Sequence, residues 1–217
     1  METIAAISKN KKCLPFDKVR LREKEIAVLP FAWGLRQNRV IRHIENAGIR
    51  VAALEQPLKI KHPDRLPFLI TRGSLLRLAM LPRLLDQHIP GWREQALSVN
   101  CDDLSGLLTA HILARETRYL RLTGGQAAAI RQLFFREYGF LSDSAEQAIS
   151  LSELLQPVAI SAGQHTLPLP LAEALLLTIS RQAPSVSPAY LFRLARLAAY
   201  YGFELPPSST AAEPSRK

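Results

Sequence analysis

The side chains that could perform acid–base or metal chemistry are few and scattered. The five histidines lie at positions 43, 62, 88, 111 and 165, and none has a second histidine one helical turn away to share a metal ion. His111 stands among apolar residues and is expected to be a hydrogen-bonded core histidine. Asp102 and Asp103 are adjacent, so their carboxylates point apart and favour a helix cap over an acid–base pair. Phosphate-loop, dinucleotide, zinc-protease and serine-hydrolase motifs are absent, so we predict no catalytic, cofactor-binding or metal-binding residue and no enzyme.

Composition indicates a folded protein rather than a disordered one. The chain has 217 residues, of which 47% are apolar, enough for one sizeable core. Leu and Ala dominate and only 7% of residues are aromatic, which favours helices over sheets. Cys13 and Cys101 form no paired motif, so a reducing cytoplasm is expected. The longest apolar run, Leu167 to Ile179, is interrupted and too short to span a bilayer, so we predict no integral membrane segment.

The positive charge is concentrated in the first half of the chain. The net charge is +9, and residues 1–100 hold 18 Lys and Arg against 9 Asp and Glu. This asymmetry indicates nucleic acid, an acidic protein surface or anionic lipid as a partner, or else a solvated face that keeps the protein soluble. Arg36, Arg39 and Arg42 step three residues apart along a predicted helix, so they share one flank and are candidate contacts.

The periodicity predicts a mostly α-helical fold, a compact multi-helix domain. A small β-hairpin is expected near residues 49–61, with Ile49–Leu54 pairing with Leu58–Lys61. Helices are predicted over 33–47, 71–85, 104–122, 126–138, 171–180 and 189–201. We predict three parts, which are a basic N-terminal extension over 1–61 that begins with a mobile arm, a helical core domain over 62–205, and a disordered tail over 206–217.

The central helices have one nucleic-acid interpretation. Two helices joined by a tight turn at Gly124-Gly125 would form a helix-turn-helix, with Arg131, Gln132 and Arg136 facing outward. Leu122-Thr-Gly124 followed by Ile130-Arg-x-Leu-Phe-x-Arg-Glu137 resembles the flagellar master-regulator C-subunit family, which activates transcription. The four-cysteine zinc cluster of that family has no counterpart here. If DNA is bound, the flank of Arg36, Arg39 and Arg42 is the better candidate, because the second half of the chain has no net charge.

Three short elements resemble another family, the K component of the type III secretion sorting platform. They are His62-Pro-Asp-Arg-Leu-Pro67, then Pro90-Gly-Trp-Arg-Glu94, then Leu120 to Arg131. The resemblance implies a helical, non-catalytic cytoplasmic adaptor that links the inner-membrane ring to the cytoplasmic pods. Its partners would be proteins of that membrane-associated complex. Arg65 and Trp92 are the candidate contacts, since Arg and Trp are enriched at binding hot spots, and the alternative for Trp92 is a place in the core.

Overall fold

The structure is a computed structural model that describes residues 2–9, 17–34, 37–55, 57–117, 119–125, 127–138, 147–148, 159–162 and 164–205. The chain forms two compact units. Unit 1 comprises Met1–Arg77, Pro157–Val186 and Tyr190–Glu204, and unit 2 comprises Leu78–Gln156, Ser187–Ala189 and Leu205–Lys217. Each unit contains a sheet with parallel strands, so the fold class is α/β and the mostly α-helical expectation is wrong. The predicted disordered tail, 206–217, lies outside the described residues.

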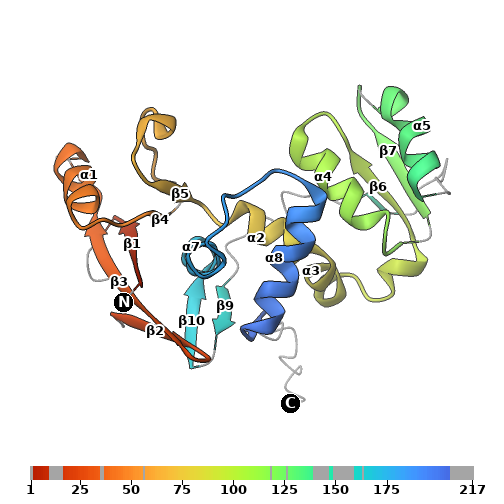
Figure 1. Ribbon diagram of the computed structural model, residues 1–217. Helices are drawn as coiled ribbons and strands as arrows, with labels where there is room; N and C mark the ends of the chain where they lie inside the picture. The colour runs from red at the N-terminus through yellow and green to blue at the C-terminus, as the bar shows by residue number, and fades with distance from the viewer. Residues whose placement is uncertain are drawn as a thin grey trace, which may run out of the picture. The chain divides into compact units, whose positions relative to one another are not determined.

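Unit 1 is built on a five-stranded sheet in the order β2-β3-β1-β4-β5 (Figure 1). Strands β1 (Glu2–Ser8), β3 (Lys24–Ala32), β4 (Val51–Leu54) and β5 (Leu69–Thr71) are parallel, and β2 (Lys18–Leu21) pairs antiparallel with β3 at one edge. The central strand is β1, and its residues from Ile4 to Ile7 are all buried. Such unbroken burial is typical of a parallel strand with both faces covered.

Helices cover the two faces of this sheet. Helix α1 (Gln37–Asn46) packs Ile44 against one face, where Ile7 and Leu54 contribute to the same apolar cluster. Helix α7 (Leu169–Ser180) contacts β1, β4 and β5 and lies on the opposite side of the sheet from α1 (Figure 1). Almost every residue of α7 is buried, as expected of a helix that is apolar all round.

A second, smaller sheet completes unit 1. Strands β9 (Ala159–Ala162), β10 (His165–Pro168) and β11 (Phe203–Glu204) are antiparallel, with β9 in the middle. Strand β10 runs directly into α7. Helix α8 (Pro188–Tyr200) precedes β11 and buries Tyr190, Leu191, Leu194 and Ala198.

Unit 2 is a three-stranded parallel sheet with helices packed on one apolar cluster. Strands β6 (Ala96–Asn100), β7 (Tyr119–Thr123) and β8 (Gln147–Ala148) occur in the order β7-β6-β8. The helices described in this unit are α3 (Leu81–His88), the short 3-10 helix η2 (Trp92–Glu94), α4 (Leu104–Leu113) and α5 (Ala127–Tyr138). Side chains of α3, α4 and α5 meet Leu97, Val99 and Leu120 of the sheet in a single core.

Three predicted elements differ from the structure. The predicted arm at residues 1–25 is wrong where the structure describes it, because β1 is the central strand of the main sheet and β2 also lies there. The predicted hairpin near residues 49–61 is wrong, because β4 pairs with β1 and β5 in parallel. The helix-turn-helix is wrong too, because β7 stands between α4 and α5 and Gly124 follows a strand.

Most of the predicted helices are confirmed. The prediction over 33–47 corresponds to α1, the one over 126–138 to α5, and those over 171–180 and 189–201 to α7 and α8. The prediction over 71–85 corresponds to two helices, α2 (Ser74–Ala79) and α3. Asp103 caps α4, since its Oδ1 accepts the backbone N–H of Gly106 at 2.7 Å.

The Asp103 cap gives a direct stability prediction. Asp103→Ala removes the acceptor for the first turn of α4, and the free energy of unfolding is expected to fall by about 1 kcal/mol. Asp103→Asn keeps a capping oxygen and is expected to recover most of that loss. Urea unfolding monitored by circular dichroism measures both variants. Equal losses for the two variants would contradict a capping role.

Candidate functional site

The cations that the sequence singled out lie mainly on the surface of unit 1. Arg39 and Arg42 are exposed on α1, and Arg65 is exposed at the end of the short 3-10 helix η1 (Pro63–Arg65). Arg36 lies outside the described residues. Lys59 and Lys61, in the segment before η1, are exposed as well. We call the set of Arg39, Arg42, Lys59, Lys61 and Arg65 the basic surface.

The two parts of the basic surface rest on the same apolar cluster. Val40 and Ile41 of α1 are partly buried against it, and so are Leu58, Ile60 and Leu66 of the segment around η1. Apolar and charged residues alternate at 58–61, so the lysines point outward where the apolar side chains point inward. Both parts of the basic surface are therefore anchored in the same apolar cluster.

Trp92 belongs to the core of unit 2. Its side chain is 1% exposed, and its indole N–H donates to Asp86 Oδ1 at 2.7 Å. The Arg93 guanidinium lies 4.5 Å from the centre of the Trp92 ring and bonds both Asp86 and Glu116. Hydrogen bonding from Arg93 lowers the pKa of Asp86. The core position proposed as the alternative for Trp92 is thus confirmed, and the residue is not an exposed contact within this unit.

The candidate DNA contacts are exposed on α5 of unit 2. Arg131, Gln132 and Arg136 all face solvent. Leu133 and Phe135 are exposed as well, on opposite flanks of the same helix. Because β7 stands between α4 and α5, the two helices do not form the helix-turn-helix on which the proposed DNA contacts depended.

His111 of α4 is a hydrogen-bonded, half-buried side chain. Its Nδ1 lies 2.7 Å from the hydroxyl of Tyr138 on α5, and its ring packs 4.4 Å from that of Phe134. Burial lowers the pKa of His111, and burial also raises the pKa of Tyr138 to about 12. This arrangement fits the expected role of a satisfied core histidine that ties two helices together.

The end of β6 in unit 2 is filled by the chain's own polar groups. The carboxyl ends of parallel strands often form ligand sites, with phosphate held at a helix N-terminus. Here the Asp103 carboxylate occupies the N-terminus of α4, and Asp102 Oδ1 accepts the N–H of Gly125 at 2.6 Å. A Cβ on Gly124, whose φ is +98°, would meet both Asp102 and Asn100 within 2.7 Å. Two carboxylates at this place disfavour a phosphate.

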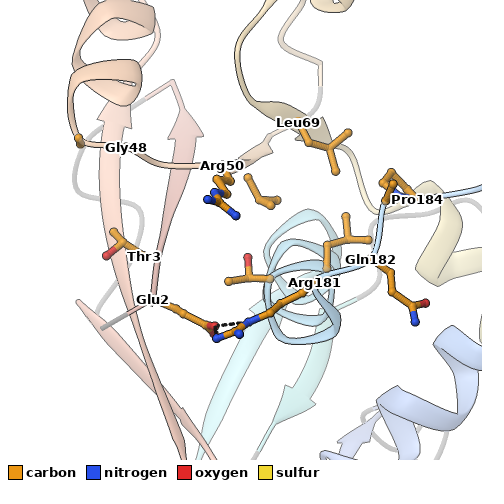
Figure 2. Close-up of a pocket in the computed structure, with 13 residues that line it drawn as sticks. Glu2, Thr3, Gly48, Arg50, Leu69, Arg181, Gln182 and Pro184 are labelled. Carbon is orange, nitrogen blue, oxygen red and sulfur yellow. Dashed lines mark hydrogen bonds and ion pairs between the residues drawn. The ribbon is translucent and has the colours of Figure 1, made fainter.

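A pocket of about 680 Å³ opens in unit 1 at the amino ends of the parallel strands. It lies beside the first residues of β1, β4 and β5 (Figure 2). Arg50 comes from the segment between α1 and β4, and Arg181 comes from the residue after α7. Arg181 Nη2 pairs with Glu2 Oε1 at 2.8 Å. Val51, Leu69 and Leu177 supply apolar surface to the pocket. Sequence reasoning missed this site, because its residues come from both ends of the chain.

Unit 1 also contains a buried carboxyl group. Glu173 of α7 is 2% exposed, and its Oε2 accepts the N–H of Leu76 at 2.6 Å. Its other oxygen accepts the hydroxyl of Thr71. Burial raises the pKa of Glu173. The carboxyl therefore ties α7 to the end of β5 and the first turn of α2.

The part of the chain that the structure describes contains no group of three or more His, Cys, Asp or Glu side chains placed to hold a metal ion. Across the same residues, no helix combines the length and the apolar character needed to cross a bilayer. The architecture places the protein among α/β proteins with parallel sheets.

Comparison with known proteins shows no established family. No family model matches this chain, and no curated protein matches it. Among solved structures, it is similar to a shikimate 5-dehydrogenase-like protein with 11% sequence identity and a TM-score of 0.31. That alignment covers 91% of this chain and 97% of the other. A similarity at this level supports no inference about function.

Proposed function

We propose that this protein is a binding component of a larger assembly and that the basic surface of unit 1 contacts an acidic protein. The observation that carries the proposal is the placement of five exposed cations over one apolar cluster. Arg39, Arg42 and Arg65 have no acidic partner among the described residues, so their guanidinium groups are available to carboxylates.

An acidic protein suits this surface better than nucleic acid does. Glu45 and Asp64 are exposed in the same segments as the cations. Carboxylates at such positions would repel a phosphate backbone, whose binding depends on uncompensated Lys and Arg. A flexible acidic segment of a protein can place its carboxylates opposite the cations and away from Glu45 and Asp64. The type III secretion resemblance implied a helical fold that the structure does not have, so the proposal names no particular assembly.

The test uses an acidic peptide as a probe. A fluorescein-labelled poly-glutamate peptide is titrated with the native protein and with the triple variant Arg39→Gln, Arg42→Gln, Arg65→Gln. Exposed ion pairs contribute about 0.5 kcal/mol each, so the triple variant is expected to bind about tenfold more weakly. The binding of the native protein is expected to weaken as salt is added.

A matched control loses the same charge elsewhere on unit 1. Arg20, Arg193 and Arg196 are exposed outside the basic surface, and their triple Gln variant is expected to bind as the native protein does. Equal losses in the two triple variants would show that net charge alone attracts the peptide, and would refute the proposal. Tighter binding to duplex DNA than to the peptide at the same salt concentration would favour nucleic acid instead.

A further inference from the structure

The pocket of unit 1 is lined by two arginines and by several apolar side chains. Its volume, about 680 Å³, lies within the range of small-molecule sites, roughly 300–1,000 Å³. Val51 and Leu177 are buried and Leu69 is half-buried, so together they form an apolar lining. Guanidinium groups of Arg50 and Arg181 provide the charge. Such a combination suits a small organic anion that carries an apolar body.

The backbone of Arg50 is fixed while its charge lacks a partner. Ile49 and Val51, on either side, are both buried, and the carbonyl oxygen of Arg50 accepts the N–H of Leu69 at 2.8 Å. Among the described residues, no acidic side chain pairs with Arg50. A guanidinium on a fixed backbone is well placed to bind a carboxylate or phosphate through two parallel hydrogen bonds.

The second arginine of the pocket is already engaged by a carboxylate of the protein. Both Nε and Nη2 of Arg181 bond a single oxygen of Glu2, at 3.2 and 2.8 Å, and the Arg181 side chain is 78% exposed. Arg181 has a left-handed backbone at φ 53°, a conformation that costs a residue other than glycine about 1 kcal/mol. In Figure 2 the Glu2–Arg181 pair lies on a different side of the pocket from Arg50. Glu2 thus binds the guanidinium group of Arg181, which could otherwise bind an anionic ligand.

We propose that this pocket binds a small organic anion, with its carboxylate or phosphate at Arg50 and its apolar body against Val51, Leu69 and Leu177. Glu2 acts as an internal competitor, because it holds Arg181 and adds negative charge beside the pocket. This site is independent of the basic surface proposed above.

The experiment uses hexanoate as the probe. Hexanoate is titrated into the isotopically labelled full chain and followed by two-dimensional amide NMR, which detects weak binding. Shifts are expected at the amides of Thr3, Leu69 and Thr178, which line the pocket. Acetate lacks the apolar body and 1-hexanol lacks the charge, so both are expected to bind more weakly. Hexyl phosphate, compared with hexanoate, identifies the preferred anionic group.

Two variants are expected to change the affinity in opposite directions. Arg50→Gln removes the charge-assisted hydrogen bonds and is expected to weaken hexanoate binding about tenfold. Glu2→Gln releases Arg181 and removes a negative charge, so it is expected to strengthen binding several-fold. The matched controls are Arg196→Gln and Glu23→Gln, which make the same charge changes at exposed positions outside the pocket. They are expected to leave the affinity unchanged.

Several outcomes would overturn the proposal. Absence of hexanoate-induced shifts at the pocket would do so, and so would unchanged affinity in a folded Arg50→Gln protein. Inorganic phosphate or acetate binding as tightly as hexanoate would show that the apolar lining has no role. Because poly-glutamate binding is measured with different variants, failure of this proposal leaves the basic-surface proposal standing, and the reverse also holds.

Discussion

Gly106→Ala is expected to destabilise unit 2 strongly. A Cβ at this position would lie 1.9 Å from the carbonyl oxygen of Asn100 and 3.0 Å from its carbonyl carbon. Both atoms belong to the end of β6, so neither can rotate away as a side chain would. To relieve the overlap, the first turn of α4 must move off β6. We expect a loss of at least about 3 kcal/mol in the free energy of unfolding, at the upper end of the usual cost of overpacking.

Tryptophan fluorescence can assign this loss to unit 2. Trp92 is buried in unit 2 and Trp33 belongs to unit 1, so a Trp33→Phe background leaves Trp92 as the reporter. Urea unfolding in this background is compared for Gly106→Ala and for two controls. Ser105 is exposed in the same turn, and a Cβ at Gly125 would meet only an ordinary contact at 3.7 Å, so alanine at either is expected to cost little. A cost for Gly106→Ala no larger than these would disprove the close approach of α4 to β6.

Glu173→Ala is expected to lower the free energy of unfolding of unit 1 by about 3 kcal/mol. The change deprives the N–H of Leu76 and the hydroxyl of Thr71 of their acceptor and leaves a cavity in a buried helix. Glu173→Gln is expected to cost less, because its carbonyl oxygen can still accept from Leu76 and its amide can donate to Thr71. Arg196→Ala, at an exposed position on α8 of the same unit, is the control and is expected to change stability by less than about 0.5 kcal/mol.

The same carboxyl should make stability depend on pH. Because burial raises the pKa of Glu173 above its ordinary value of 4.5, the folded state binds the proton more tightly than the unfolded state does. This contribution is fully present below the ordinary pKa and is lost as the pH rises through the folded pKa. Glu173→Gln stays neutral, so its stability relative to the native protein should rise over that pH range. Unfolding free energies measured from about pH 4 to about pH 8 test this. A constant difference between the two proteins would show that Glu173 does not titrate abnormally.

The sequence predicted helices correctly where apolar residues recur over a long stretch. It did not predict the parallel sheets. Ile4 to Ile7 is a short apolar run without alternation, and such a run cannot be assigned to helix or strand by its period. Residues 51–54 were predicted as a strand, but their partners β1 and β5 could not be predicted from a local hairpin pattern. Strand β7 was assigned to the preceding helix because Tyr119 continues the helical spacing of Leu108 and Ile112.

Charge and capping could be read locally, whereas the pocket could not. The concentration of cations in the first hundred residues and the cap at Asp103 both depend on neighbouring residues in the sequence. Glu173 was not singled out by the sequence, because the residues that it bonds, Thr71 and Leu76, lie about a hundred positions away in the chain. Arg50 and Arg181 meet the same pocket because α7 returns to the sheet, a contact that no spacing rule indicates.

The discontinuity of unit 1 has a consequence for synthesis on the ribosome. Strands β1 to β5 emerge first, but α7, which packs on three of them, is translated only after residues 78–156, the longest segment of unit 2. Until then the nascent sheet exposes apolar surface, and Thr71 and Leu76 lack the carboxyl group that later binds them. A chaperone that shields such surface during elongation would meet the growing chain in this interval. This interval ends when α7 has been synthesised and packs on the sheet.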